Sequence, residues 1–315
     1  MKYIVLFFLS ITTLWAQDTT TTKRYQYKVW IKPSLSINYL AVDIEDSPIN
    51  INLKNKTILP NYPLTMGLGL GVHNTYVNLD YARGLMPLRN ENKYGKTSYF
   101  DFQIHSFISN KFLLDLYYQS YKGFYYENGQ NIHLLKDARV QQIGSEFLYF
   151  TKWRETSLKN IFNPEGNQLK PLFSFYVGGG VFYHKLSLPL IDPDITDDFK
   201  HIQTGLSGGV ANLWQIAPNL TFSGLVGLGF YFGGETAPIS KMKINQYVNF
   251  RYNIALTYKI KNSTIDFSIL HNNKRVYFNN SDLVSIKNST FRISFTQQLN
   301  VTTRHNNKVM RFLGM

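Results

Sequence analysis

The chain of 315 residues contains no cysteine, which excludes a disulfide framework, a thiolate metal site and a catalytic thiol. Beyond its first residues it also lacks any uninterrupted apolar run of the roughly 20 residues that a transmembrane helix needs. Charged residues make up only 17% of the chain, although the formal net charge is +13. Lysine and arginine are scattered rather than clustered, so we expect no nucleic-acid partner.

Aromatic residues and glycine are abundant, with 22 Tyr, 23 Phe, 4 Trp and 21 Gly. This composition favours many β-strands joined by tight turns. The N-terminus reads as a secretory signal peptide, because Lys2 precedes an apolar stretch at 4–15 and Ala16 suits cleavage. A stretch of that length is too short to span a bilayer as a helix. If the mature chain lies in a membrane, it must cross as strands.

Alternation with a period of two is the dominant pattern of the sequence. In 246–259 one face carries large apolar groups and the other carries polar ones: Val248, Phe250, Tyr252, Ile254, Leu256 and Tyr258 against Asn249, Arg251, Asn253, Ala255, Thr257 and Lys259. Successive side chains of a strand point to opposite sides. The same pattern recurs at 63–72, 173–184 and 219–232, with glycine or small polar residues opposite the apolar ones. It is typical of membrane strands with lipid outside and a crowded lumen inside.

Short and long connections alternate along the chain. Short turns are expected near residues 73, 109, 217 and 261, and long polar segments lie at 83–96, 122–137, 185–200, 233–245 and 273–286. The candidate strands are 34–42, 48–54, 63–72, 75–82, 97–108, 111–121, 138–150, 172–184, 202–215, 220–232, 246–260, 264–272 and 287–299. A bacterial barrel needs an even number of strands. Assigning 48–54 to an outer loop leaves 12, and adding 25–31 would give 14.

The predicted fold is therefore an all-β, transmembrane, antiparallel up-and-down β-barrel of 12 strands, with 14 as the alternative. The expected organisation is a signal peptide at 1–16, an N-terminal periplasmic segment at 17–33, the barrel at 34–299 and a C-terminal tail at 300–315. The expected location is the bacterial outer membrane, reached through a cleaved signal peptide. For such a protein, outer-membrane lipid and lipopolysaccharide are the expected partners.

Charged and polar groups in mid-strand positions should point into the lumen. The candidate lumen cluster consists of Asp101, Gln103, His105, Asp115, Glu146, Arg251, Asp266 and Arg292, with Asp80 nearby. The expected register places Gln103 opposite Asp115, and the catalytic interpretation is an acid–base pair in which Asp115 or Asp101 orients His105. Ion pairs that fill the lumen are the more ordinary interpretation, because no Ser or second His falls at a suitable spacing.

Two further features bear on the site. Residues 151–171 are long for an inner turn, and an ordinary periplasmic loop is the first interpretation. The alternative is a break in the barrel wall at Asn163-Pro164, since proline cannot donate to a sheet ladder. Aromatic residues near strand ends, including Tyr99, Tyr121 and Tyr125, suggest interfacial girdles. No metal site and no cofactor are expected, because the acidic loop at 192–198 lacks the pattern of a calcium loop.

A family resemblance supports the same architecture. The segment YGKTSYFDFQIHSFISNKFLLDLYYQSYKGFYYENG, Tyr94 to Gly129, resembles a family of outer-membrane barrels from Bacteroidota, the domain of unknown function numbered forty-four twenty-one. FSFYVGGGVFYHKL, from Phe173 to Leu186, is similar to a second segment of that family, whereas 151–172 departs from the expected pattern. The resemblance implies fold and location, and it brings no substrate or catalytic residue.

Three functions remain open from the sequence. The first is a channel or carrier for small or lipid-like molecules, for which a wall break would favour lateral passage. The second is a structural or accessory barrel that binds lipopolysaccharide or a partner protein. The third, a lipid-modifying outer-membrane enzyme, is the weakest, so no catalytic residue is assigned and we expect no enzymatic activity.

Overall fold

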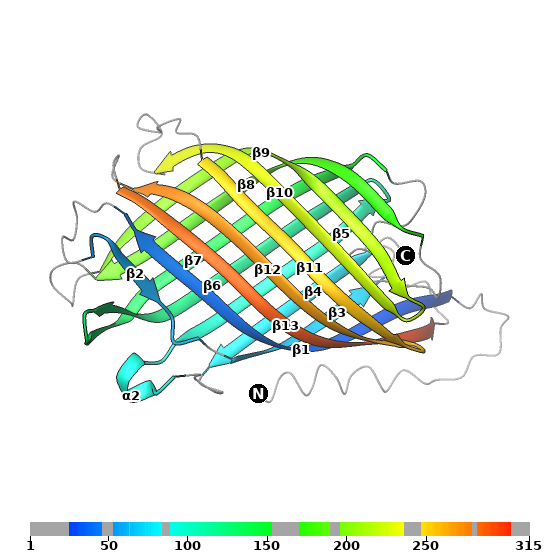
Figure 1. Ribbon diagram of the computed structural model, residues 1–315, viewed down its shortest axis with the longest axis horizontal. Coiled ribbons are helices and arrows are strands. Elements are labelled where there is room, and N and C mark those ends of the chain that lie inside the picture. The colour runs from blue at the N-terminus through cyan, green and yellow to red at the C-terminus, as the bar shows by residue number, and fades with distance from the viewer. Residues whose placement is uncertain are drawn as a thin grey trace.

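The computed structural model describes residues 25–45, 53–62, 64–72, 74–83, 89–152, 170–189, 196–235, 247–278 and 282–303. Within these ranges it contains thirteen strands and one short helix. Twelve strands pair with their neighbours in a closed antiparallel ring (Figure 1). They are β1 (Tyr25–Ile44), β3 (Leu64–Val72), β4 (Thr75–Arg83), β5 (Ser98–Ser109), β6 (Phe112–Asn128), β7 (Asn131–Phe150), β8 (Leu172–Pro189), β9 (Thr196–Ala217), β10 (Leu220–Glu235), β11 (Tyr247–Ile260), β12 (Ser263–Phe278) and β13 (Asp282–Thr303).

Closure of the ring depends on the first and last strands. β1 and β13 pair from Tyr25↔Thr303 to Ile44↔Val284, which leaves no free edge in the wall. The prediction of twelve barrel strands is confirmed. The alternative of fourteen was wrong, because 25–31 continues directly into 34–42 as one strand. Pro33 sits inside this strand opposite Leu68 of β3.

The barrel is also longer than expected at its two chain ends. Residues 25–33 belong to β1 rather than to a periplasmic segment, and β13 continues past 299 to Thr303. The expected loop at 122–137 is mostly strand, because β6 and β7 extend to a turn at Gly129-Gln130. The expected strand at 48–54 lies largely outside the described residues, and its end at Leu53 belongs to a turn.

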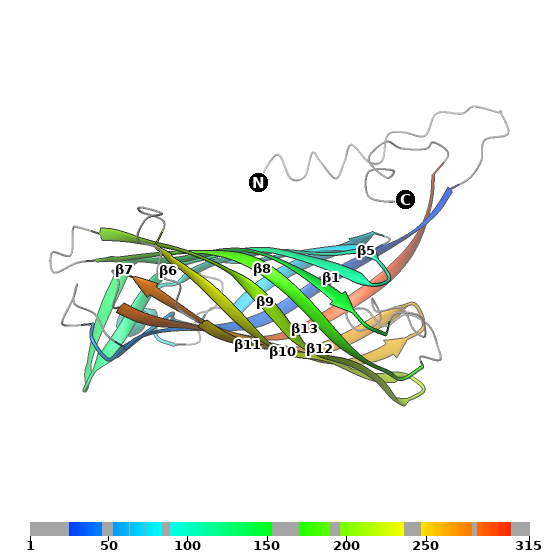
Figure 2. The ribbon, with the colours of Figure 1, turned by 90° about the horizontal axis from the view of Figure 1, so that it is seen from above.

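The two ends of the barrel differ in their connections. Four tight connections join β3 to β4, β5 to β6, β9 to β10 and β11 to β12 at the end where β1 begins and β13 finishes. We call this the inner end, because outer-membrane barrels have their short turns on the periplasmic side. At the opposite, outer end (Figure 2), longer segments connect β1 to β3, β4 to β5 and β10 to β11, whereas β6 and β7 meet in a tight turn. The long connection from β7 to β8 is the exception at the inner end.

The thirteenth strand, β2 (Lys56–Leu59), changes the outer end. β3, β4 and β5 stop short there, whereas β1 and β6 continue, and β2 pairs with both of them. The outer circuit therefore runs through β1, β2 and β6–β13, ten strands of the described chain instead of twelve. A narrower ring brings opposite walls closer together.

The wall presents an apolar surface to its surroundings. Large apolar side chains on the outward face are exposed, including Leu68, Leu70, Ile143, Phe175, Val177, Leu206, Phe230, Phe267 and Phe291. Their chain neighbours point inward, as alternation requires. An exposed apolar band around a closed barrel is the form that lipid stabilises. Among the described residues, no helix has the length and apolar character needed to cross a bilayer.

Candidate functional site in the barrel lumen

Arg251 is the centre of a charged network in the middle of the lumen. It lies on β11 and reaches across to two strands of the facing wall, where it pairs with Glu146 of β7 and, at 3.5 Å, with Asp115 of β6. Glu146 also accepts a hydrogen bond of 2.8 Å from Ser207 Oγ. The carboxylates of Glu146 and Asp115 are both buried, and both pair with the guanidinium of Arg251. The network therefore ties opposite walls of the barrel together.

His105 joins this network through Asp115. Its Nδ1 lies 2.8 Å from Asp115 Oδ1, because β5 and β6 place the two residues directly opposite each other. The expected register was wrong by two residues: Asp115 faces His105, and Gln103 faces Tyr117. An even shift keeps every side chain on its face, so the lumen assignment survives.

The other predicted lumen residues form separate groups. Asp101 Oδ2 accepts hydrogen bonds from Tyr99, Gln103 and Gln119 at 2.7 to 3.1 Å. Asp266 accepts one from Thr257 at 2.7 Å and lies 3.6 Å from Lys32 Nζ. These contacts satisfy Asp266 and the Oδ2 atom of Asp101, whereas Asp101 Oδ1 is buried without a hydrogen-bond partner among the described residues.

Arg292 belongs to yet another group, in which it pairs with Asp80, a residue that also accepts a hydrogen bond from Ser34. Four of the eight predicted residues thus share one network, namely His105, Asp115, Glu146 and Arg251. Asp101 and Gln103 share a second one. Asp266 and Arg292 lie in different groups.

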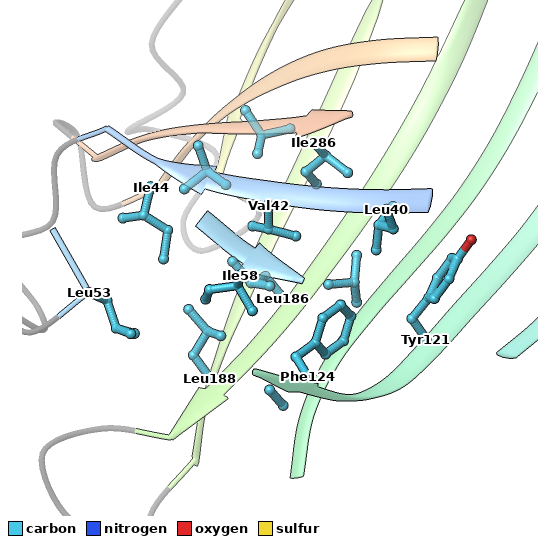
Figure 3. Close-up of a cluster of buried hydrophobic side chains, with 14 of the residues drawn as sticks. Leu40, Val42, Ile44, Leu53, Ile58, Tyr121, Phe124, Leu186, Leu188 and Ile286 are labelled. Atoms are coloured by element: carbon cyan, nitrogen blue, oxygen red, sulfur yellow. The ribbon is translucent and has the colours of Figure 1, made fainter. Parts of the chain in front are cut away.

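A cluster of apolar side chains fills the outer end of the lumen (Figure 3). This outer cluster joins residues from β1, β2, β5, β6, β7, β8, β12 and β13: Leu40, Val42, Ile44, Leu53, Ile58, Tyr99, Tyr121, Phe124, Ala138, Val140, Leu186, Leu188, Val276, Val284 and Ile286. It spans from β1 and β13 to the facing strands β6–β8. Packed apolar side chains across a narrowed ring obstruct the lumen at this level, as far as the described residues extend.

The outer cluster corrects the interpretation of several aromatic residues. Tyr99 and Tyr121 are buried in the outer cluster, and Tyr125 is buried against Arg89 and Tyr94, so none of the three belongs to an exposed interfacial girdle. At Gly123 a bulge with a φ of 89° shifts the register between Lys122 and Phe124. Glycine adopts this backbone conformation without strain, and the shift places Phe124 in the outer cluster, whereas its neighbour Tyr125 packs against Arg89 and Tyr94.

Lys274 closes the lumen just below the outer cluster. It extends from β12 to the facing wall, where its Nζ lies 3.8 Å from the ring centre of Phe182 and contacts the Tyr117 hydroxyl. The side chain is buried, and the two rings supply the negative faces that a cation prefers. Sequence reasoning missed this residue because a single lysine at a strand end looks solvent-exposed.

The gap above the short strands is covered by a loop that α2 (Glu91–Tyr94) stabilises. Asn61 donates hydrogen bonds to the carbonyls of Arg89 and Gly95, at 3.3 and 2.7 Å. The Arg89 guanidinium lies over the rings of Tyr62 and Tyr94 and donates to Tyr125. Burial raises the pKa of Tyr62 well above its usual range, so its hydroxyl stays protonated.

A cavity of about 120 Å³ lies in the inner half of the lumen, beside β1, β3–β5 and β10–β13. Trp30 and Tyr76 contribute aromatic surface, and Asn78, Asn253, Ser268 and Thr290 contribute amide and hydroxyl groups. Gly69 and Gly71 also line the cavity, and a side chain at these positions would clash with Asn78 or Tyr76. A second hollow of about 80 Å³ shares Gln103, His105 and Asn253 with this cavity and reaches the Arg251 network.

The facing side of the inner half is packed. Nine buried residues of β5–β10 form an inner cluster, namely Phe107, Leu113, Leu148, Phe150, Leu172, Tyr176, Ala211, Leu213 and Leu225. The cavity is therefore confined to one side of the lumen. The proposed wall break at Asn163 and Pro164 lies outside the described residues, and no group of three metal-ligating side chains occurs within them.

A closed ring of antiparallel strands, an outward apolar band and a polar mid-lumen define the class of this protein: it is an outer-membrane β-barrel. The chain belongs to the family described as "Domain of unknown function (DUF4421)", whose model matches residues 16–297. A search of curated proteins found no match.

Solved structures with the same kind of fold include three barrels with little sequence identity. The translocator domain of autotransporter NalP from Neisseria meningitidis is 8% identical, with a TM-score of 0.47, and 95% of each chain is covered. The β domain of the Bordetella autotransporter BrkA is 9% identical, with a TM-score of 0.40 and coverage of 85% of this chain and 98% of that chain. The Ralstonia pickettii toluene transporter TbuX is 9% identical, with a TM-score of 0.34 and coverage of 85% and 89%. These similarities concern fold alone.

Proposed function

We propose that this protein is a carrier for a small polar solute and that its barrel is closed toward the outside at rest. The observation that carries this proposal is the position of the cavity. It lies in the inner half of the lumen, and the outer cluster together with Lys274 separates it from the outer end. A solute would enter from the periplasmic side, and its release outward would require the outer end to rearrange.

The lining of the cavity indicates the chemistry of the solute. Amides, hydroxyls and an aromatic pair, Trp30 with Tyr76 at 5.7 Å between ring centres, suit a compact molecule with several hydrogen-bonding groups. Arg292 lines the cavity, and its Nε is buried without a hydrogen-bond partner among the described residues. This N–H group can donate to an oxygen atom of the solute.

A catalytic role for the His105–Asp115 pair is not part of this proposal. Asp115 is shared with Arg251, and the pair faces the lumen rather than the lipid surface where a lipid-modifying enzyme would meet its substrate. We assign the pair to the stabilisation of the mid-lumen. His105→Ala should therefore lower the free energy of unfolding. Membranes that contain this variant should show the same lipid modifications as membranes that contain the wild-type protein.

The absence of cysteine allows a direct test by thiol labelling. The protein is inserted into vesicles in one orientation, which bulky maleimides verify at Asn92→Cys in α2 and at Asn219→Cys in the β9–β10 turn. Ser268→Cys, in the cavity, should then react with a small charged methanethiosulfonate added at the inner end and not at the outer end. Equal reaction from both ends would reveal an open pore, and reaction from neither end would mean a sealed structural barrel; each result overturns the proposal.

Conductance provides a second measurement. In a planar bilayer the wild-type barrel should show no steady single-channel current, because the outer cluster obstructs the lumen. Persistent openings at low voltage in the unmodified protein would contradict the closed resting state.

We also propose that residues 1–16 are removed during export. The support is the positive charge at Lys2 followed by the apolar stretch and Ala16. N-terminal sequencing of protein extracted from outer membranes should begin at Gln17, and a retained Met1 would refute cleavage.

A further inference from the structure

Four cations lie side by side on the outward face of the outer end. Lys122 of β6 is directly opposite Arg139 of β7, and Lys185 of β8 is directly opposite Lys200 of β9. The two pairs are neighbours, because Gln141, two residues from Arg139, faces Lys185. Adjacent strands are about 4.8 Å apart, so this basic row extends over roughly 15 Å.

The orientation of the row follows from its chain neighbours. Arg139 stands between Ala138 and Val140, which are buried in the outer cluster. Lys185 stands between His184 and Leu186, which are also buried inside the barrel. Alternation therefore points the charged side chains away from the lumen.

Carboxylates of the protein itself neutralise only part of the positive charge of the basic row. Asp137 pairs with Lys122 at 3.0 Å, and Asp198 pairs with Lys185 at 2.7 Å. Arg139 and Lys200 are exposed, and neither lies within ion-pair distance of a carboxylate among the described residues. Like charges directly opposite on paired strands destabilise a sheet. An external anion would remove this repulsion.

The row lies at the edge of the apolar band. On β8 the outward residues Phe173, Phe175, Val177 and Val181 are exposed apolar groups, and Tyr183 separates them from Lys185. The ten steps from Phe173 to Tyr183 measure about 33 Å along the strand, or about 25 Å along the barrel axis at a tilt of about 40°. This height equals the usual apolar band of such barrels, which places Lys185 at the level of the lipid headgroups.

We propose that the basic row binds the phosphate groups of an anionic lipid in the outer leaflet, specifically a glycolipid that carries two phosphates. Each pair of opposed cations, Lys122 with Arg139 and Lys185 with Lys200, takes one phosphate. The row is wider than a single phosphate can bridge. Its continuity with the apolar band provides a surface for the acyl chains, which a free phosphate ion would not use.

The test measures lipid binding to the purified full-length barrel in a neutral detergent, with diphosphoryl lipid A, monophosphoryl lipid A and inorganic phosphate as probes. The wild-type protein should prefer the diphosphoryl lipid. Arg139→Ala/Lys200→Ala should weaken that binding at least tenfold and abolish the preference over the monophosphoryl form. The exchange Arg139→Lys/Lys200→Arg, which keeps the charges, should retain most of the binding.

A charge-matched control removes two cations elsewhere. Lys136→Ala/Lys152→Ala loses the same charge from exposed positions outside the row and should change binding less than twofold. Heat-modifiable mobility on gels verifies that each variant is folded. Unchanged lipid binding in the Arg139/Lys200 variant would refute the site, and inorganic phosphate that binds as well as the lipid would show a free-anion site instead.

Discussion

The Arg251 network makes a quantitative prediction about stability. Arg251 and Glu146 have side chains that are 20% and 7% exposed, so solvent screens their attraction poorly. Breaking a buried pair by removing one partner costs about 3–5 kcal/mol, because the remaining charge is left uncompensated. After Arg251→Met, Glu146 keeps the hydroxyl of Ser207 at 2.8 Å and Asp115 keeps His105. We therefore expect the lower part of that range, about 3 kcal/mol.

A double-mutant cycle separates the pair from its surroundings. Glu146→Gln leaves Arg251 with Asp115 at 3.5 Å and should cost about 3 kcal/mol as well. The double variant Arg251→Met/Glu146→Gln removes both charges, so it should cost well under the sum, with a coupling of at least about 2 kcal/mol. The exposed pair Lys96–Glu91, with side chains 70% and 29% exposed, supplies the control. Lys96→Met should cost less than about 1 kcal/mol.

The assay is reversible unfolding in urea from phosphatidylcholine vesicles, followed by tryptophan fluorescence. Two results would refute the reasoning. The first is additivity of the two single substitutions within about 0.5 kcal/mol, which would mean that the charges act independently. The second is an Arg251→Met cost as small as that of Lys96→Met, which would mean that water screens the mid-lumen as it screens the surface.

Three further predictions concern packing in the lumen, the outward apolar band and the outer end of the barrel. Gly227→Ala would push a methyl group against the Tyr176 hydroxyl and should cost about 1–3 kcal/mol in the same unfolding assay, part of which Tyr176→Phe in the same chain should restore. Val177→Arg places a charge in the middle of the apolar band and should cost about 2–4 kcal/mol in vesicles; a neutral result would mean that lipid does not cover this face. Replacement of 53–59 by a flexible Gly/Ser segment removes β2 and should produce a steady single-channel current, whereas a barrel that stays closed would show that β2 is not needed to seal it.

Much of the barrel can be predicted from the sequence because alternation determines which face of each strand is apolar. The face assignments hold at Val248, Phe250 and Tyr258, which are exposed, and at Asn249 and Thr257, which are buried. Even the error of two residues in the β5–β6 register preserved the lumen residues, since an even shift changes partners and not faces. Which lumen residues touch across the barrel is not encoded locally, because Arg251 meets Glu146 through the curvature of the closed wall.

The closed outer end was missed, although the sequence carries a signal for it. In β1 the inward positions are Ser34, Ser36 and Asn38, and then the same face continues as Leu40, Val42 and Ile44. Apolar residues thus pass to the lumen face toward the outer end of the strand. A barrel open along its whole length would keep that face polar, so the change marks the start of the outer cluster.

The topology explains how a twelve-strand barrel can be filled by its own side chains. Barrel diameter grows roughly linearly with strand number, and about eight strands give an interior that side chains fill. Shortening β3–β5 and inserting β2 reduces the outer circuit to ten strands, a decrease in diameter of about one sixth. Large residues such as Phe124 and Tyr121 can then meet Leu40 and Ile286 without an inserted plug.

β2 is held by three residue pairs to β1 and two to β6, the smallest number of any strand in the described sheet. At about 1 kcal/mol for each backbone hydrogen bond, its release costs only a few kcal/mol of pairing, together with the burial of Ile58 and Leu53. β2 is therefore the element whose displacement widens the lumen most for the smallest loss of sheet hydrogen bonds.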